Sequence, residues 1–150
     1  MGKVGLSERE AVKEGFQIAS ALVPAGDKAH YYPGTRDIII KLIADKTTKK
    51  LLGAEIVGEG VVDKRIDIIA TALTFGATVD QVSKLDMAYA PPYAMSMDAV
   101  IVAANVLGNK LSGKTMGILP HEVAERLDRG EDFVLLDVRT EMEYQSGHIK

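Results

Sequence analysis

Cysteine is absent from the 150 residues of this sequence, tryptophan is absent too, and histidine occurs only three times. Without cysteine, these residues contain no disulfide framework, no thiolate zinc site and no cysteine nucleophile. The histidines, His30, His121 and His148, are scattered along the chain, which disfavours a histidine-based metal site as well. We therefore predict no metal site, and any chemistry of these residues has to use other side chains.

An excess of positive charge is lacking as well. The 18 lysines and arginines are outnumbered by 21 aspartates and glutamates, and they form no cluster that would attract nucleic acid or an anionic membrane. The apolar runs are broken well short of the ~18 residues that a membrane span requires. No signal-peptide pattern follows Met1. The sequence thus predicts a globular, cytoplasmic protein without nucleic-acid or membrane partners.

The first half of the chain has the pattern of a short antiparallel sheet. Ser7 and Glu10 have the spacing of a capping box, and Gly15 provides a stop, which predicts a helix over residues 7–14. Apolar and β-branched runs of strand length follow, at residues 16–23, 36–44 and 51–57. A polar turn at 45–50 separates the last two runs, so they are expected to form a hairpin.

Helical periodicity begins beyond residue 60. It predicts an amphipathic helix over residues 63–75, a short helix over 78–85, and a last helix that is capped by Ser96 and ends near Leu107. Prolines exclude a helix in the intervening segment, residues 89–93. The predicted fold class is α+β: a short antiparallel sheet with helices mainly on one face, followed by an incomplete α/β segment.

The last of these helices has almost no polar face. Its apolar residues are Ala99, Val100, Ile101, Val102, Ala103, Ala104, Val106 and Leu107. A helix that is apolar all round has to be buried on more than one side. We therefore expect a second subunit or a neighbouring domain to cover it, whereas the alternative is a helix that is central to a larger core.

The composition changes after residue 110. Residues 111–117 are expected to link a first domain, residues 1–110, to a second segment, residues 118–150. This segment contains a predicted helix over 120–128 and an apolar run at 133–138 of the kind buried in a parallel sheet. One helix and one strand cannot form a core of their own, so we expect the segment to be the beginning of a larger domain.

Four sequence blocks occur in an order and spacing typical of a known family. They are VGLS at residues 4–7, HYYPG at 30–34, DKRID at 63–67 and AYAPPY at 88–93. In these blocks the chain resembles the C-terminal dimerisation domain of the pyridine nucleotide-disulfide oxidoreductases, especially the coenzyme A-disulfide reductase branch, which is close to the NADH oxidases and persulfide reductases. The resemblance implies a homodimer in which this domain reaches the partner's active site.

The tail carries a second resemblance. LLDVR at residues 135–139, followed by GHI at 147–149, is similar to the first strand and turn of a rhodanese domain, in which Asp137, Arg139 and His148 would be scaffold residues. The two resemblances imply a coenzyme A-disulfide reductase fused to a rhodanese domain. The resemblance also implies that FAD, NAD(P)H and the redox cysteines are held by other parts of the parent protein. In agreement, no Gly-x-Gly-x-x-Gly phosphate cradle follows a strand in these residues, and they contain no cysteine.

Tyr31 and Tyr89 are the catalytic candidates that the first resemblance implies. The glutathione reductase branch uses a His-Pro sequence as a proton relay, whereas this chain has APP at residues 90–92, which leaves the role open to tyrosine. A phenol with a pKa near ~10 is protonated at neutral pH and can donate a hydrogen bond to a departing thiolate. Tyr32 and Tyr93 are the alternatives, and the rival interpretation is that the tyrosines only pack on prolines at an interface.

Lys64 and Arg65 are weaker candidates, for contacts with the phosphates of a coenzyme A-like substrate. They lie just inside a predicted helix N-terminus, which favours anions. A more common arrangement for such a pair is a solvated face or an ion pair with Asp63 or Asp67. His30 is expected to form loop hydrogen bonds rather than to act as a catalyst.

The function that these observations imply is that of a fragment of a flavin- and NAD(P)H-dependent reductase of coenzyme A disulfide, persulfide or polysulfide. This part would supply the homodimer interface and the tyrosines that complete the partner's active site, and it would show no turnover alone. The alternatives are a purely structural dimerisation module without catalytic residues, and a part of an NADH oxidase or a sulfurtransferase.

Overall fold

The computed structural model describes residues 1–149. They form two compact units, of which the first is Met1–Met116 and the second begins at Gly117. Unit 1 contains a sheet and four helices, and unit 2 contains two helices. None of the helices in the described part of the chain combines the length and the apolar character that crossing a membrane requires.

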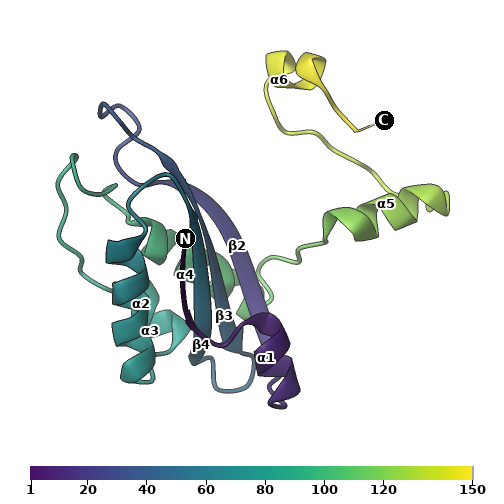
Figure 1. The fold of residues 1–150 in the computed structure, drawn as a ribbon. Coiled ribbons are helices and arrows are strands. Elements are labelled where there is room, and N and C mark those ends of the chain that lie inside the picture. The colour runs from purple at the N-terminus through teal and green to yellow at the C-terminus, as the bar shows by residue number, and fades with distance from the viewer. Residues whose placement is uncertain (150) are drawn as a thin grey trace. The chain divides into compact units, whose positions relative to one another are not determined.

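Unit 1 is built on a four-stranded antiparallel sheet with the order β1-β4-β3-β2 (Figure 1). The strands are β1 (Gly2–Gly5), β2 (Ile18–Gly26), β3 (Asp37–Asp45) and β4 (Leu51–Gly58). β3 and β4 form the predicted hairpin. Its turn is closed by the Asp45 carboxylate, which accepts hydrogen bonds from the backbone N–H groups of Thr47 and Thr48 at 3.2 and 3.0 Å. β1 was not predicted, and it completes the sheet by pairing with β4.

β2 continues through Pro24 to Gly26, whereas the sequence pattern predicted its end at residue 23. Proline has no N–H to donate and is excluded from the middle of a sheet. β2 is an edge strand, so one of its sides needs no backbone partner. Pro24 can therefore remain in the strand, where it lies opposite Ile39 of β3.

The helices of unit 1 are α1 (Glu8–Lys13), α2 (Asp63–Thr74), α3 (Val79–Ser83) and α4 (Ala99–Leu111). Both predicted capping boxes are confirmed. The Ser7 side chain caps α1, the Thr78 side chain caps α3, and Glu10 and Gln81 return the hydrogen bond to the backbone of the cap residue.

α4 begins after Asp98, not after the predicted cap Ser96, and it ends at Leu111 rather than near Leu107. The Asp98 carboxylate accepts a hydrogen bond from the backbone N–H of Val100 at 3.1 Å, which is the bond that defines a cap. The helix therefore takes in the first residue of the segment that was expected to be a linker.

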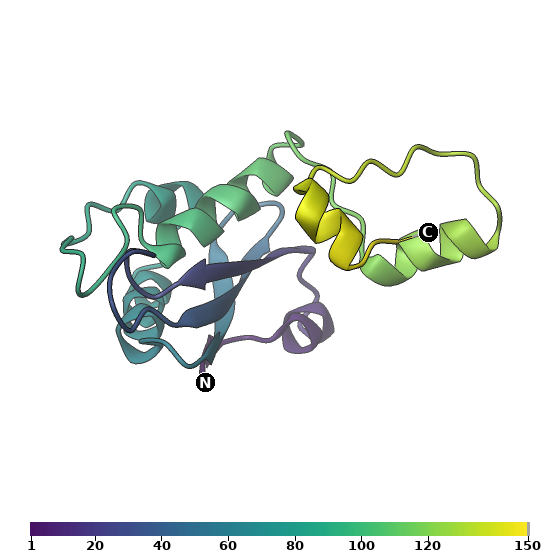
Figure 2. The ribbon, with the colours of Figure 1, turned by 90° about the horizontal axis from the view of Figure 1, so that it is seen from above.

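The core of unit 1 lies between one face of the sheet and the helices α2, α3 and α4. Figure 2 shows α4 running along this sheet. Side chains alternate along β3, where Ile38, Ile40 and Leu42 are completely buried in the core and Ile39 is exposed on the other face. Ile69 of α2 joins the same cluster. The predicted α+β arrangement of unit 1 is confirmed.

α4 packs on β2 and β3 and also against α3. Its fully buried residues are Ala99, Val100, Ala103, Ala104 and Leu107. Its half-buried apolar residues are Ile101, Val102 and Val106. One copy of unit 1 thus covers most of the apolar surface of α4 by packing on two sides of it. The alternative of a helix central to a core describes α4 better than a helix that depends on a second subunit for its burial.

The other face of the sheet is partly open. At the end near α1, the ammonium group of Lys41 makes an ion pair with Glu8 at 3.0 Å. On the same face, Leu22, which is directly opposite Lys41, and Ile39 and Val57 have 63%, 39% and 49% of their surface exposed. Ile39 and Val57 lie directly opposite each other on β3 and β4. Neighbouring exposed apolar side chains of this kind are typical of a contact surface.

Unit 2 contains α5 (Pro120–Asp128) and α6 (Glu141–Ser146). α5 has the predicted bounds, whereas α6 was not predicted. The strand predicted over residues 133–138 is wrong: this segment is irregular, and its apolar side chains Val134, Leu136 and Val138 are exposed. A strand needs a neighbour for its backbone groups, and no described residue pairs with this segment.

Candidate functional site

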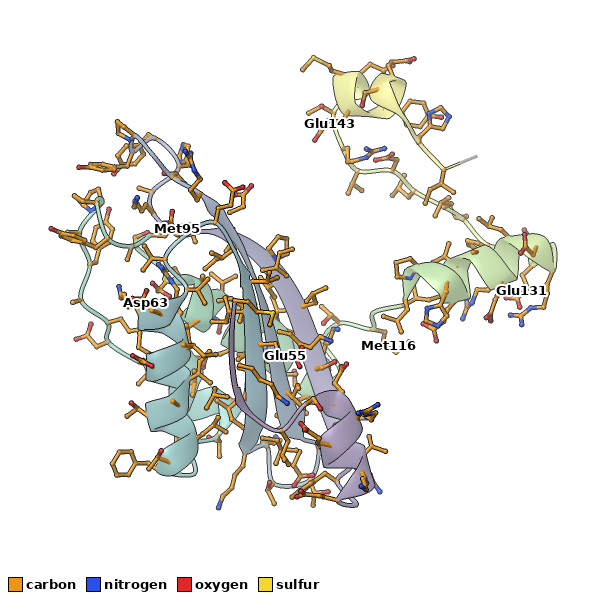
Figure 3. The ribbon with its side chains drawn as sticks, viewed as in Figure 1. Glu55, Asp63, Met95, Met116, Glu131 and Glu143 are labelled. Carbon is orange, nitrogen blue, oxygen red and sulfur yellow. The ribbon has the colours of Figure 1, made fainter. Side chains whose placement is uncertain are left out.

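Two loops lie side by side at one end of unit 1 (Figure 1, Figure 2). The first loop, residues 27–36, connects β2 to β3, and the second loop, residues 84–98, connects α3 to α4. The start of α2 lies at the same end, as the label of Asp63 in Figure 3 shows, and Met95 marks the second loop. These two loops carry all four tyrosines of the sequence-based prediction.

The first loop is held by its own hydrogen bonds. At its base, the backbone N–H of Asp27 donates to the carbonyl oxygen of Arg36, and the N–H of Arg36 donates to the Asp27 carboxylate, both at 2.9 Å. Within the loop, the hydroxyl of Thr35 lies 2.8 Å from the carbonyl oxygens of both Ala29 and Tyr32. These bonds hold the tyrosine-bearing backbone in one conformation.

The second loop turns at its prolines. The carbonyl oxygen of Ala90 accepts hydrogen bonds from the backbone N–H groups of Tyr93 at 2.9 Å and Ala94 at 3.1 Å. Ala94 is buried, so the turn is anchored in the body of unit 1. Pro91 lies inside the turn and its ring restricts the backbone further. Tyr89 precedes this stiff turn directly.

The structure brings Tyr31 and Tyr89 together. The side chains of Tyr89 and Tyr31 share a hydrogen bond, and this bond, with smaller contributions from desolvation and from the charge of Tyr31, raises the pKa of Tyr89 above its ordinary value. Both side chains are open to solvent, with 66% of the surface of Tyr31 and 50% of that of Tyr89 exposed. Two adjacent hydroxyl groups are thus accessible to a ligand.

The alternative tyrosines are placed differently. Tyr32 is half-buried in the first loop, and Tyr93 directly follows the two prolines of the second loop, with 69% of its surface exposed. His30 packs edge-on against the ring of Tyr31, with ring centroids 5.5 Å apart and planes at 82°. This contact orients the Tyr31 ring.

Arg65 of α2 is completely buried and joins the two loops. Its Nε and Nη2 atoms donate to the two carboxylate oxygens of Asp98, at 3.3 and 2.9 Å. Nη1 donates to the carbonyl oxygen of Val61 at 2.8 Å, and Nη2 donates to that of Asp27 at 2.7 Å. One guanidinium group therefore contacts the first residue of one loop and the last residue of the other.

Lys64 and Arg65 have different surroundings. The ion-pair partner of Arg65 is Asp98, not the Asp63 or Asp67 that were considered from the sequence. The ammonium group of Lys64 lies 3.9 Å from the same Asp98 carboxylate, and its side chain is 34% exposed. Of the two cations, only Lys64 can reach a ligand without breaking buried hydrogen bonds.

Asp27 is a second buried acid at this end of unit 1. Its carboxylate accepts hydrogen bonds from the backbone N–H groups of Arg36 at 2.9 Å and Val61 at 3.1 Å. Burial works to raise the pKa of Asp27, but these two hydrogen bonds and the nearby charges of Lys28 and Arg65 outweigh it and lower the pKa. The ionised carboxylate thus holds Val61, which in turn binds Arg65.

Sequence reasoning did not identify Asp27 and Asp98 as part of this site. Arg65 contacts them over separations of 38 and 33 positions, and no local pattern links residues so far apart. The available signal for Asp98 was its place directly before the apolar run of α4, where a helix cap is expected. Among residues 1–149, no group of three or more histidine, aspartate or glutamate side chains is arranged to hold a metal ion.

Unit 2 has a polar cluster of its own. The Arg139 guanidinium donates to the Asp137 carboxylate, at 3.0 Å from Nε and 2.7 Å from Nη2, and to the carbonyl oxygen of Gly147 at 2.9 Å. The side-chain hydrogen bonds of Arg139, followed by its backbone N–H, hold the pKa of Asp137 at about 2. The rings of Tyr144 and His148 stack, with centroids 3.9 Å apart. These contacts fix the two ends of α6.

The comparison with protein families identifies unit 1. The dimerisation domain of the pyridine nucleotide-disulphide oxidoreductases matches residues 1–101, which include the complete sheet and the beginning of α4. The chain therefore belongs to this family, and the family predicted from the four sequence blocks is confirmed.

Individual relatives indicate which branch of the family this chain resembles. The NAD(P)H sulfur oxidoreductase (CoA-dependent) of Pyrococcus furiosus is 47% identical over 107 residues, which are 71% of this chain and 24% of the relative. The coenzyme A disulfide reductase of Staphylococcus epidermidis is 34% identical over 110 residues, 73% of this chain and 24% of that protein. This chain spans about a quarter of the length of these relatives.

The fold of this chain can also be compared with that of a solved structure. The reduced CoADR-RHD of Bacillus anthracis superposes with a TM-score of 0.89 at 34% identity, and the match covers 99% of this chain and 26% of that structure. The small antiparallel sheet of unit 1 with its helices is thus the fold of a disulfide-reductase dimerisation domain.

Proposed function

We propose that this chain is the dimerisation part of a homodimeric, FAD- and NAD(P)H-dependent enzyme that reduces coenzyme A disulfide, a persulfide or a polysulfide. The family and its relatives, a CoA-dependent sulfur oxidoreductase and a coenzyme A disulfide reductase, support this proposal. The observation that carries it is the pair Tyr31 and Tyr89, two phenols in contact on fixed loops and open to a ligand.

In this proposal the tyrosines stabilise the sulfur that leaves. The overall reaction consumes NAD(P)H, one proton and a disulfide, and it yields NAD(P)⁺ and two thiols. When the S–S bond breaks, one sulfur departs as a thiolate. A phenol has a pKa near ~10, above the ~8.5 of a thiol, so it keeps its proton and donates a hydrogen bond to the thiolate. Such a donor stabilises the negative charge as it develops.

The hydrogen bond between the two tyrosines links their hydroxyl groups. Each phenol can accept a hydrogen bond from the other while it donates its own proton to a further acceptor. A hydroxyl that accepts a hydrogen bond becomes a stronger donor. We therefore assign the donor role toward the substrate sulfur to the pair.

FAD and NAD(P)H are assigned to other parts of the whole protein. The described residues have no glycine-rich phosphate cradle after a strand, and β4 leads through a bend at Glu59 and Gly60 into the connection to α2. Lys64 is the residue that this chain offers to a phosphate group of coenzyme A, because its ammonium group is accessible near the start of α2.

We assign residues 118–150 to the beginning of a rhodanese domain. The match to the B. anthracis CoADR-RHD over nearly all of this chain supports the assignment, as does the LLDVR sequence with its Asp137–Arg139 pair. Sulfur transfer by such a domain uses a cysteine, and the 150 residues contain none. Sulfurtransferase activity is thus proposed for the whole protein only.

The test is the turnover of the whole protein with coenzyme A disulfide and NAD(P)H after replacement of single tyrosines. Tyr31→Phe and Tyr89→Phe are each expected to lower kcat by about 10²-fold, the usual cost of removing one hydrogen-bond donor to a developing negative charge. Tyr93→Phe removes a hydroxyl from the same loop outside the pair, and is expected to leave kcat within about twofold. Wild-type turnover in both Tyr31→Phe and Tyr89→Phe would instead establish the purely structural module.

A further inference from the structure

The two tyrosine loops are joined by a single buried side chain. Arg65 contacts Asp27, which begins the first loop, and Asp98, which ends the second loop. It also contacts Val61, in the connection between β4 and α2. Three segments that are distant in the sequence therefore meet at one guanidinium group. The Arg65 side chain is completely buried, so this group has no contact with solvent.

We propose that Arg65 is a positioning residue, which fixes the two loops relative to each other so that the hydroxyls of Tyr31 and Tyr89 meet. Its effect on catalysis rests on the function proposed for the tyrosines, whereas its effect on the geometry of the loops does not. This role is distinct from the contact with coenzyme A phosphates that the sequence pattern predicted for Arg65.

The guanidinium group is suited to this task by its shape. Its planar fork offers five N–H groups in fixed directions, of which two face the carboxylate of Asp98 and two others reach the carbonyl oxygens of Val61 and Asp27. A lysine has a single nitrogen atom on a flexible stem. It can bind the Asp98 carboxylate or the Asp27 carbonyl oxygen, but it cannot hold both in a defined geometry.

The charges of this cluster are balanced within unit 1. Arg65 is compensated by Asp98, which is 2% exposed, and Lys64 lies at the outer side of the same carboxylate. Every buried side-chain nitrogen and oxygen in the described part of the chain has a hydrogen-bond partner. A buried ion pair contributes little net stability compared with apolar side chains of the same volume. What Arg65 adds over such side chains is the defined direction of its bonds.

The geometric part of the proposal is tested on the full chain with Arg65→Lys. Tyrosines labelled with ¹³C at Cζ are followed by NMR while the pH is raised, and the signal of Tyr89 is assigned with Tyr89→Phe. In the wild type the pKa of Tyr89 is raised by its bond to Tyr31. In Arg65→Lys we expect it to fall toward ~10, the value of a free phenol.

Arg36→Lys is the matched control. It is the same substitution at the other end of the first loop, where the guanidinium group is exposed and 3.7 Å from Glu59. The Tyr89 titration is expected to remain as in the wild type. An unchanged Tyr89 titration in a folded Arg65→Lys chain overturns the proposal, and so does an equal change in Arg36→Lys.

Asp98→Asn covers the case in which Arg65→Lys does not fold. Asparagine caps a helix as well as aspartate does, so α4 keeps its start, while the carboxylate that orients Arg65 is lost. Circular dichroism establishes that the variant is folded. The same fall in the Tyr89 pKa is expected, and a titration like that of the wild type overturns the proposal.

The catalytic part is tested in the whole protein by a double-mutant cycle. Arg65→Lys is expected to lower kcat, and in a Tyr89→Phe background it is expected to add less than about twofold further loss, because both changes break the same pair. Full additivity overturns the positioning role in catalysis. If the NMR result is as expected but Tyr89→Phe is fully active, the proposed function fails while the structural role of Arg65 stands.

Discussion

Four charged side chains are buried in unit 1: Asp27, Asp45, Arg65 and Asp98. Asp45 closes the hairpin between β3 and β4, and the other three join the tyrosine loops. A buried charge is tolerated only with well-directed partners, since its desolvation costs several kcal/mol. At this end of the molecule, single residues are thus positioned by polar geometry, and a small displacement breaks several hydrogen bonds together.

Gly60 is the residue that allows Asp27 to take its place. A Cβ atom at residue 60 would lie 2.6 Å from Cβ of Asp27 and 2.9 Å from Cγ2 of Ile38, closer than packed atoms approach. Gly60→Ala is therefore expected to displace Asp27 and to lower the free energy of unfolding by about 1–3 kcal/mol, the usual cost of overpacking. Urea denaturation measures this change. Unchanged stability would mean that Asp27 moves without losing its hydrogen bonds.

The ionised acids of unit 1 predict a loss of stability in acid. Hydrogen bonds from the side chains of Lys3 and Ser7 lower the pKa of Glu10 from 4.5 to about 2, and the pKa values of Asp27 and Asp45 are lowered too. Each folded-state pKa lies below the unfolded one, so the stabilisation is complete above the unfolded pKa and is lost as the pH falls through the folded pKa.

We therefore expect the thermal midpoint of unit 1 to be level between about pH 7 and 5 and to fall between about pH 4 and 2. Asp27→Asn should remove part of this fall, because the substituted side chain no longer takes up a proton there. Asp86→Asn, in an exposed part of the second loop, serves as the control with an unchanged profile. A midpoint that rises between pH 5 and 3 would contradict the sign of these shifts.

The individual residues of the site were predictable to different degrees. Tyr31 and Tyr89 stand in sequence blocks shared with a family, so the resemblance alone indicates them as site residues. The pairing of Arg65 with Asp98 depends on the packing of α2 against the start of α4, and nothing within one segment reveals it. A buried salt bridge becomes predictable only when the fold is known.

Elements were predicted well where their signals are local. The caps at Ser7 and Thr78 involve residues three positions apart, and both helices begin where these patterns place them. Strands depend on neighbours that are distant in the sequence. β2 extends past Pro24 because it is an edge strand, and residues 133–138 form no strand because no partner is present among the described residues.

α4 offers a prediction at the scale of an element. Gly108 lies inside this helix, and a Cβ atom there would be 3.8 Å from Cγ1 of Val79, an ordinary contact. Glycine destabilises a helix interior relative to alanine through its backbone freedom. Gly108→Ala is expected to raise the free energy of unfolding by about 0.5–1 kcal/mol in urea denaturation. A loss of stability would show that α3 and α4 approach more closely than this structure indicates.

At the scale of the whole molecule, family membership rather than the packing of α4 is the evidence that favours a dimer. The apolar character of α4 predicted a partner, but one copy of unit 1 covers most of that helix. The match to a dimerisation domain now carries the expectation. Leu22, Ile39 and Val57 leave exposed apolar surface on the open face of the sheet, which is typical of a surface that contacts another chain or domain.

The two units also differ in how far they can fold alone. All completely buried apolar side chains among residues 1–149 belong to unit 1, and no residue of α5 or α6 is buried. A chain that ends at Met116 is therefore expected to keep the thermal midpoint of the full chain within about 2 °C, the effect of a fraction of a kcal/mol.

The peptide from Gly117 onward is expected to show some helical circular dichroism and no cooperative unfolding, because short helices without a core are marginal in water. A midpoint lowered by many degrees in the shortened chain, or a sharp transition in the peptide, would show that the second unit has stabilising contacts that its exposed side chains do not indicate.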